Sequence, residues 1–238
     1  TMRADEIWRK HQQGASTAGL SIYVVVLDGL GTYSASARLW DELNANWSKY
    51  GDKQVLIDYA KFHAVEITYE ALAASKADIL IISNNWNPTQ TYGAFSEAEA
   101  KAIARYVSEG AGLYVSAGTF CNGDYSQLQS HVTYLAPLVG LSAEEKYFWS
   151  GTTYDVVEQK ISGHPIWRNI ASPYTSGWKD KTLVPSSKTW TSAAIPKGTL
   201  VGLSQNGQTA AVVYSNRVFY SSLSEMLPGT EADKQFLY

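Results

Sequence analysis

The sequence predicts an α/β protein: a three-layer α/β/α sandwich around a mostly parallel central sheet, with antiparallel strands near the C-terminus. Two observations support this fold class. Up to residue 116, near-continuous apolar runs alternate with segments of helical periodicity, which is typical of a parallel sheet covered on both faces. Beyond residue 199, three apolar runs are separated only by hairpin-type turns. A chain of 238 residues fits a single domain, 1–238, which we expect can be a module of a longer protein.

Apolar runs identify the strands. The parallel strands are expected at residues 21–28, 54–60, 77–83 and 113–116. The closing strands are expected at 199–203, 209–214 and 217–221, joined at Asn206-Gly207 and Ser215-Asn216. Between residues 120 and 198 only short strand-like runs, such as 154–157, are apparent.

Capping residues identify the helices. The expected helices are a short one at 3–13, one after Ser34 or Ser36 that carries Leu39, Trp40, Leu43 and Trp47, one at 69–75 after Thr68, one from Ser96 to Gly110, and one beginning at Glu231. Ser96 and Glu99 have the spacing of a capping box. The helix that they begin stops at Gly110.

Composition narrows the class of partner. A net charge of −3 gives no long-range attraction for nucleic acid, and no apolar run is long enough for a transmembrane segment. The single cysteine, Cys121, excludes an internal disulfide. The 8 Trp and 16 Tyr suit a wet recognition surface such as a sugar-binding cleft, and together with the low charge they favour an exported protein, extracellular or periplasmic.

Candidate binding residues follow the predicted parallel strands. Because right-handed crossovers gather the carboxyl ends of such strands at one edge, we expect a cleft there. Amides and an indole at that edge can hydrogen-bond to a sugar and stack on it. The predicted binding residues are Asp28, Asn84, Asn85, Trp86, Phe120, Asp124, Tyr125 and Trp149, with Trp178 as a further aromatic.

Ser116 is the candidate nucleophile. It ends the strand 113–116 and is followed by Ala117-Gly118, so it is either a nucleophile at a sharp turn or a small residue in a tight corner. A serine needs a base to take its proton, and His131 and His164 are the candidates. Asp28, Asp124 and Glu225 are candidate acids or Ca²⁺ or Mg²⁺ ligands, but they lack the spacing of a cation-binding loop, so neither a metal nor a cofactor is expected.

The layout resembles the class I glutamine amidotransferase-like fold, which is flavodoxin-like, over residues 20–238. The resemblance rests on the strand at 22–28, the stretch "ALAASKADILIIS" at 71–83, the capped helix and corner at 96–118, and the closing strands. The "GHPI" at 163–166 and the terminal helix are similar to the trehalose-utilisation-like branch. The resemblance therefore implies the three-layer sandwich.

The elbow residues differ from those of true amidotransferases, which carry Gly-x-Cys-x-Gly and a later His-x-Glu pair. Here the elbow reads Tyr114-Val-Ser-Ala-Gly118 and the later pair reads Leu223-Ser-Glu225, while Cys121 lies five residues past the elbow. Glutamine amidotransferase chemistry is therefore not expected. The Ser-Ala-Gly triplet is similar to the serine peptidases typified by cyanophycinase and aspartyl dipeptidase, although Tyr114 replaces their first glycine.

Two functions remain open. The first, which we favour, is a non-catalytic or accessory amidotransferase-like domain of an exported protein that binds carbohydrate or a protein partner through an aromatic-rich cleft. The alternative is a serine hydrolase or peptidase in which Ser116 has His131 or His164 as base and main-chain amides near Gly118 as oxyanion hole. The sequence leaves the ligand and the oligomeric state undetermined.

Overall fold

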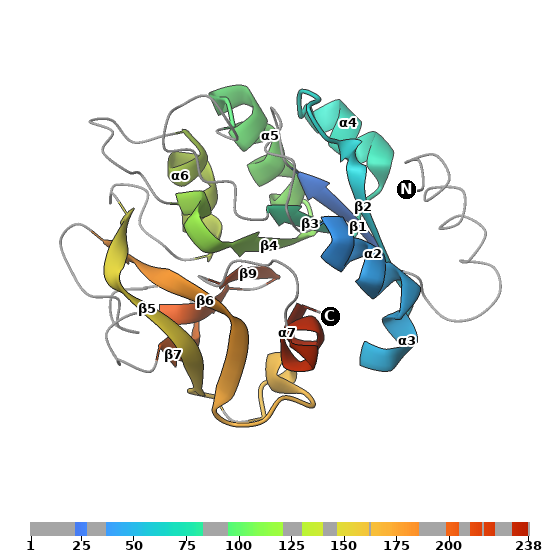
Figure 1. Ribbon diagram of the computed structural model, residues 1–238. Coiled ribbons are helices and arrows are strands. Elements are labelled where there is room, and N and C mark those ends of the chain that lie inside the picture. The colour runs from blue at the N-terminus through green and yellow to red at the C-terminus, as the bar shows by residue number, and fades with distance from the viewer. Residues whose placement is uncertain are drawn as a thin grey trace.

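The computed structural model describes residues 22–27, 37–82, 95–120, 130–139, 147–161, 163–185, 199–204, 210–215, 217–221 and 230–237. Its strands are β1 (Ile22–Leu27), β2 (Val55–Phe62), β3 (Ile79–Ile82), β4 (Gly112–Ser116), β5 (Tyr147–Gln159), β6 (Tyr174–Pro185), β7 (Thr199–Ser204), β8 (Ala210–Ser215) and β9 (Val218–Ser221). Within the described ranges these nine strands form one sheet in the order β2-β1-β3-β4-β9-β8-β7-β5-β6 (Figure 1). Strands β2, β1, β3, β4 and β9 are parallel, and the remaining pairings are antiparallel. The predicted fold class is confirmed.

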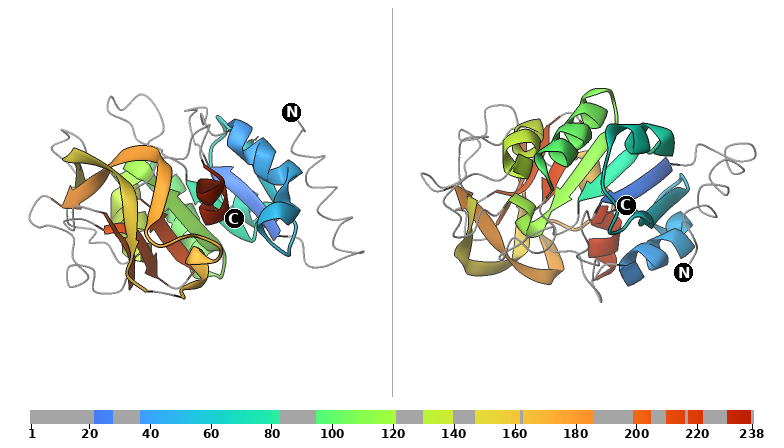
Figure 2. Two further views of the ribbon diagram at one scale, coloured as in Figure 1. Left: turned by 60° about the horizontal axis from the view of Figure 1, so that its bottom comes forward. Right: turned by 90° about the horizontal axis from the view of Figure 1, so that it is seen from above.

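Helices cover both faces of the parallel half of the sheet (Figure 2). One face carries α4 (Tyr69–Ser75), α5 (Glu97–Ser108) and α6 (Ser130–Leu135), and the other carries α2 (Ala37–Ala45), α3 (Trp47–Tyr50) and α7 (Glu231–Leu237). Single-turn helices η1 (Ala117–Phe120), η2 (Ala136–Val139) and η3 (Pro165–Trp167) complete the described elements.

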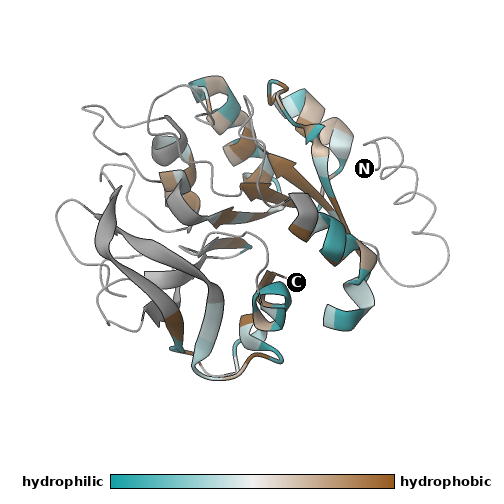
Figure 3. Ribbon diagram, in the orientation of Figure 1, coloured by the Kyte–Doolittle hydropathy of each residue, from teal (hydrophilic) through white to brown (hydrophobic). Residues whose placement is uncertain are grey.

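Each face of the sheet has its own apolar core, because successive strand residues point to opposite sides. In β1, Tyr23, Val25 and Leu27 pack under α4, α5 and α6, whereas Val24 and Val26 pack under α2 and α7. Brown strands lie between helices with teal outer surfaces in Figure 3. We call these two clusters the α5 core and the α7 core.

The predicted helix caps are present. Ala71 N donates to Thr68 Oγ1 over 3.1 Å. Glu99 N donates to Ser96 Oγ over 3.2 Å, while Ser96 N donates to Glu99 Oε2 over 2.8 Å, which is a complete capping box. The other oxygen of buried Glu99, Oε1, accepts a hydrogen bond of 3.1 Å from Ile67 N. The capping box therefore also fixes the loop before α4.

The predicted helix that carries Trp40 and Trp47 is divided. α2 ends before Asn46, whose side-chain amide donates to Glu42 O over 3.0 Å, and α3 begins at Trp47. The main-chain N–H of Asn46 donates to the same carbonyl over 3.0 Å, and side-chain bonds of this kind from Asn favour turns over helix. The expected helix at 3–13 lies outside the described residues.

The antiparallel half contains the main difference from the sequence prediction. β5 and β6 form a long antiparallel pair, of which the sequence indicated only 154–157. β7, β8 and β9 pair as consecutive antiparallel strands, as predicted. The residues at the predicted turns, Asn206, Gly207 and Asn216, lie outside the described ranges.

Candidate functional site

The strands that precede the predicted binding residues lie next to one another. Ile82 pairs with Val115, Ser116 pairs with Ser221, and β1 lies beside β3, all in parallel. The segments that leave these strands therefore start from one edge of the sheet. Seven predicted site residues come after these strands in the sequence and lie outside the described ranges: Asp28, Asn84, Asn85, Trp86, Asp124, Tyr125 and Glu225. Their convergence stays a prediction.

Ser116 is fully buried at the carboxyl end of β4. Its main-chain carbonyl accepts a 2.8 Å hydrogen bond from the Thr119 hydroxyl, which closes the turn of η1. Because strand residues alternate, Ser116 is on the same face of β4 as Tyr114. A nucleophile must be reached by its substrate, and the described structure leaves no exposed surface on this side chain.

His164 lies on that same side of the sheet. It precedes η3, and its Nδ1 accepts a hydrogen bond of 3.3 Å from Ile166 N. Its ring forms a T-shaped pair with that of Phe219, with ring centroids 6.1 Å apart, and Phe219 pairs with Tyr114. Burial lowers the pKa of His164 below its usual 6.5, so the neutral ring is favoured at neutral pH. Ser116 is two residues after Tyr114, so the rise of a strand places it about 7 Å farther along β4 than Tyr114.

The other described candidates fall in different places. His131 lies in α6, and Trp149 lies in β5 opposite Leu183; the structure does not describe their side chains. Phe120 is fully buried in the α5 core. In the described structure the Phe120 ring therefore packs inside the protein rather than on a binding surface.

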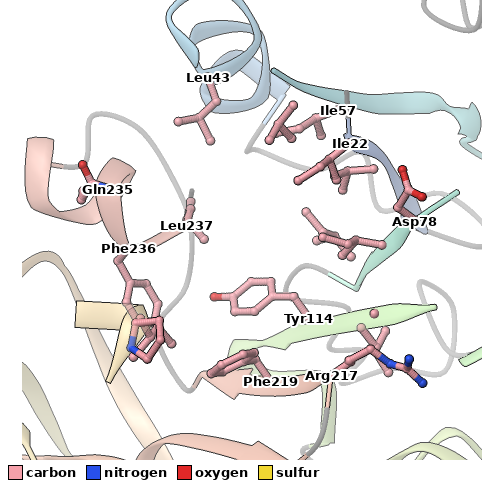
Figure 4. Close-up of a pocket in the computed structure, with 18 of the residues that line it drawn as sticks. Ile22, Leu43, Ile57, Asp78, Tyr114, Arg217, Phe219, Gln235, Phe236 and Leu237 are labelled. Carbon is pink, nitrogen blue, oxygen red and sulfur yellow. The ribbon is translucent and has the colours of Figure 1, made fainter. Parts of the chain in front are cut away.

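A cavity of about 710 Å³ lies on the α7-core face of the sheet (Figure 4). Its floor is formed by side chains of the parallel strands, among them Ile22, Ile57, Ile79, Tyr114 and Phe219. Its walls come from α2 and α7 and from the segment around η3. The Tyr114 hydroxyl points across it toward α7 (Figure 4). This volume lies within the range of small-molecule sites.

The cavity extends to the amino ends of the strands, opposite to the predicted cleft. Asp78, Gly110, Gly112 and Arg217, which precede or begin β3, β4 and β9, line this end. Of the predicted site residues that the structure describes, only His164 lines the cavity. Sequence reasoning missed the others because apolar strand residues look identical whether a helix or an open space covers them.

Charged groups of the cavity lie near its rim. Asp78 Oδ2 accepts a 2.8 Å hydrogen bond from Tyr23 N. Arg217 is exposed and lies across Gly110, so that a Cβ at position 110 would be 3.9 Å from Nη1 of Arg217. Gly110 has a φ of +130°, which suits glycine.

α7 forms one wall and is anchored at both of its sides. Buried Asp233 accepts hydrogen bonds from the Tyr174 hydroxyl, from Ser176 Oγ over 2.7 Å and from Thr230 N over 2.6 Å. Toward α2, Lys234 pairs with Glu42 over 2.6 Å. This helix therefore joins β6 to the parallel half.

Glu231 adds a second anchor of α7. It pairs with Lys49 over 2.6 Å and accepts a 3.1 Å hydrogen bond from the Tyr50 hydroxyl. Lys49, followed by smaller contributions from Lys234 and Tyr50, lowers the pKa of Glu231 to about 2. The carboxylate form is thus strongly preferred.

The described residues include no group of three or more His, Cys, Asp or Glu side chains that could hold a metal ion. No described helix is long and apolar enough to cross a membrane.

Comparison with solved structures identifies the fold, whereas no family model and no curated protein matches the sequence. A ThuA-like protein from Bacteroides uniformis ATCC 8492 has a TM-score of 0.56 and 14% identity, over 93% of this chain and 90% of that chain. A ThuA-like protein from Parabacteroides merdae ATCC 43184 has a TM-score of 0.49 and 12% identity, over 92% and 88% of the two chains.

The sheet order and the helix layers define an α/β protein of the flavodoxin-like class. The ThuA-like protein from Bacteroides uniformis shares this fold at 14% identity, so the likeness concerns the fold alone. The resemblance read from residues 20–238 is thus confirmed as to the fold.

Proposed function

We propose that this chain is an accessory, non-catalytic amidotransferase-like domain of an exported protein, which binds carbohydrate at the carboxyl edge of its sheet. The observation that carries the proposal is the full burial of Ser116, the residue at the nucleophile position. The histidine position of the later pair is Leu223, which cannot act as a base. Without an accessible nucleophile, the carboxyl edge of the sheet can still bind a ligand, and we assign it that role.

Strand order supports a binding role for this edge. β1 and β3 are neighbours, and the segments holding Asp28 and Asn84-Asn85-Trp86 directly follow them. Amide groups and an indole close together suit the hydroxyl groups and apolar faces of a sugar ring. A protein partner is the other ligand class that such a surface can accept.

The serine hydrolase is the second candidate, and one observation favours it. His164 and Ser116 are on the same side of the sheet, since His164 contacts Phe219, the partner of Tyr114. A movement that exposes Ser116 and brings His164 to it would create the nucleophile–base pair that hydrolysis requires. His131 in α6 is the other candidate base.

Two experiments separate these functions. On a glycan array we expect saturable binding that Trp86→Ala abolishes and Ser116→Ala retains, with Trp47→Ala on α3 as the matched tryptophan control. Labelling by a fluorophosphonate probe that Ser116→Ala removes would replace the binding proposal by the hydrolase. Absence of any glycan binding, with a protein partner captured through Trp86 instead, would overturn the carbohydrate assignment.

A further inference from the structure

We propose that the cavity between α2 and α7 is a second binding site, specific for a single-chain amphiphilic carboxylate such as a fatty acid. This site is separate from the carboxyl edge and does not depend on the function proposed there. Three features of the cavity carry the proposal: its size, the apolar character of its floor, and the position of its charges.

The size and floor fit an apolar chain. The cavity of about 710 Å³ is within the range of sites that enclose small ligands. Side chains from five strands form its floor, and Leu43, Phe236 and Leu237 come from the walls (Figure 4). Filling such a space with methylene groups removes apolar surface from water on both partners.

The charges are confined to the rim and are mostly positive. Arg168 and Arg217 line the cavity and are exposed, and within the described residues neither guanidinium forms a hydrogen bond or ion pair. Figure 4 shows the Arg217 guanidinium directed away from the apolar centre. Two unpaired guanidinium groups at the mouth complement a carboxylate, which they can bind through paired N–H donors.

Three polar groups of the lining, those of Asp78, Gln235 and His164, are committed to the protein itself. Asp78 accepts the main-chain N–H of Tyr23, and the Gln235 side chain donates to Tyr50 O over 2.9 Å. His164 accepts the N–H of Ile166, and burial lowers its pKa, so it adds no positive charge to the interior at neutral pH. The centre of the cavity therefore receives the apolar chain while the rim receives the anionic head.

Isothermal titration calorimetry with three single-chain amphiphiles tests the charge requirement. Dodecanoate, dodecanol and dodecyltrimethylammonium are each titrated, below micelle-forming concentration, into the full chain. We expect saturable one-to-one binding of dodecanoate, weaker binding of dodecanol and none of the cation. Equal affinity for the three, or no saturable binding of dodecanoate, overturns the proposal.

Arginine variants test the rim. Changing Arg168 and Arg217 together to Gln is expected to weaken dodecanoate binding about tenfold, the combined effect of two exposed ion pairs, without changing dodecanol binding. The matched control is Arg105→Gln, on α5 at the opposite face of the sheet, where Arg105 pairs with Glu109. Unchanged affinity in the double variant, or an equal loss in the control, contradicts the proposed contact.

Methyl NMR locates the bound chain without relying on any substitution. The Ile57, Ile79 and Ile81 methyl signals, from cavity-lining residues, are expected to shift on addition of dodecanoate. Leu72 and Ile103, in the α5 core, should not shift. Shifts confined to the α5 core, or spread equally over both cores, would refute this location.

Discussion

Replacing Asp233 by Ala tests whether one buried carboxylate holds α7 to the antiparallel half of the sheet. Among the described contacts, Asp233 accepts hydrogen bonds from Tyr174, Ser176 and Thr230. Hydrogen bonds to a charged acceptor contribute about 1.5–3 kcal/mol each, so simple addition would give about 4.5–9 kcal/mol.

Two effects make the expected loss of stability smaller than this sum. The alanine variant no longer has to desolvate a carboxylate, a cost of several kcal/mol in the native protein. In addition, α7 can detach locally without unfolding the rest of the protein. The loss of stability therefore cannot exceed the free energy by which this helix docks, which includes the burial of Phe236 at about 1.5–3 kcal/mol. We therefore expect Asp233→Ala to lower the free energy of unfolding by about 3 kcal/mol.

Urea denaturation followed by tryptophan fluorescence measures this loss. Trp167 is a suitable reporter because its ring stacks on Phe236, with centroids 5.8 Å apart. Asp233→Asn keeps the size and one acceptor oxygen and should lose less. Glu97→Gln, at an exposed ion pair with Lys101 on the opposite face, should leave the transition unchanged. A loss below about 1 kcal/mol in Asp233→Ala would refute the reasoning, since even one buried charge-assisted bond contributes more.

Three further predictions concern caps and titrating groups. Glu99→Ala should lower the free energy of unfolding by about 2 kcal/mol in urea, because it removes the capping box and leaves the buried Ile67 N–H without its acceptor. The pKa of Glu231 is lowered to about 2, chiefly by Lys49, so its stabilising effect is complete above the unfolded value of about 4.3 and is lost as pH falls toward 2. Glu231→Gln should flatten this part of a plot of Tm against pH, and an unchanged plot would contradict the assignment. Because burial lowers the pKa of His164, the unfolded chain binds a proton more readily and stability falls as pH drops through about 6.5. His164→Asn keeps a capping acceptor and should reduce the Tm difference between pH 7 and pH 5; an undiminished difference would show that other groups cause it.

The parallel half of the fold could be predicted because its signals are local. The apolar run before Asp28 has to be covered on both faces, and hydroxyl and carboxylate groups at the required spacing mark where helices begin. The capping box at Ser96 and Glu99 was predicted from four residues of sequence and is present. At Asn46 the side-chain amide bonds to the main-chain carbonyl of Glu42, and the hydrophobic periodicity alone did not show that the helix breaks there.

The antiparallel half and the cavity needed long-range information. β5 and β6 are stabilised by pairing with each other, and their Ser, Thr and aromatic residues give no clear alternation. Likewise, the sequence around Ile79 and Phe219 is that of ordinary core strands. The cavity above them exists because α2 and α7 lie apart, and no local pattern shows this separation. The position of Ser116 at the end of a strand could be predicted from the apolar run before it, whereas its burial depends on contacts distant in the chain.

The contacts of α7 have a consequence for the order in which the protein folds. Lys234 and Glu231 meet residues 192 and 181 positions earlier in the chain, and Asp233 meets β6, which is itself formed by long-range pairing. Contacts that close such long loops form late. We expect β1 to β4 to assemble first, leaving the floor of the cavity open to solvent until the last helix docks. For that interval the floor is an exposed apolar surface on a nearly complete protein, so a ligand that occupies it early would compete with aggregation as well as stabilise the native state.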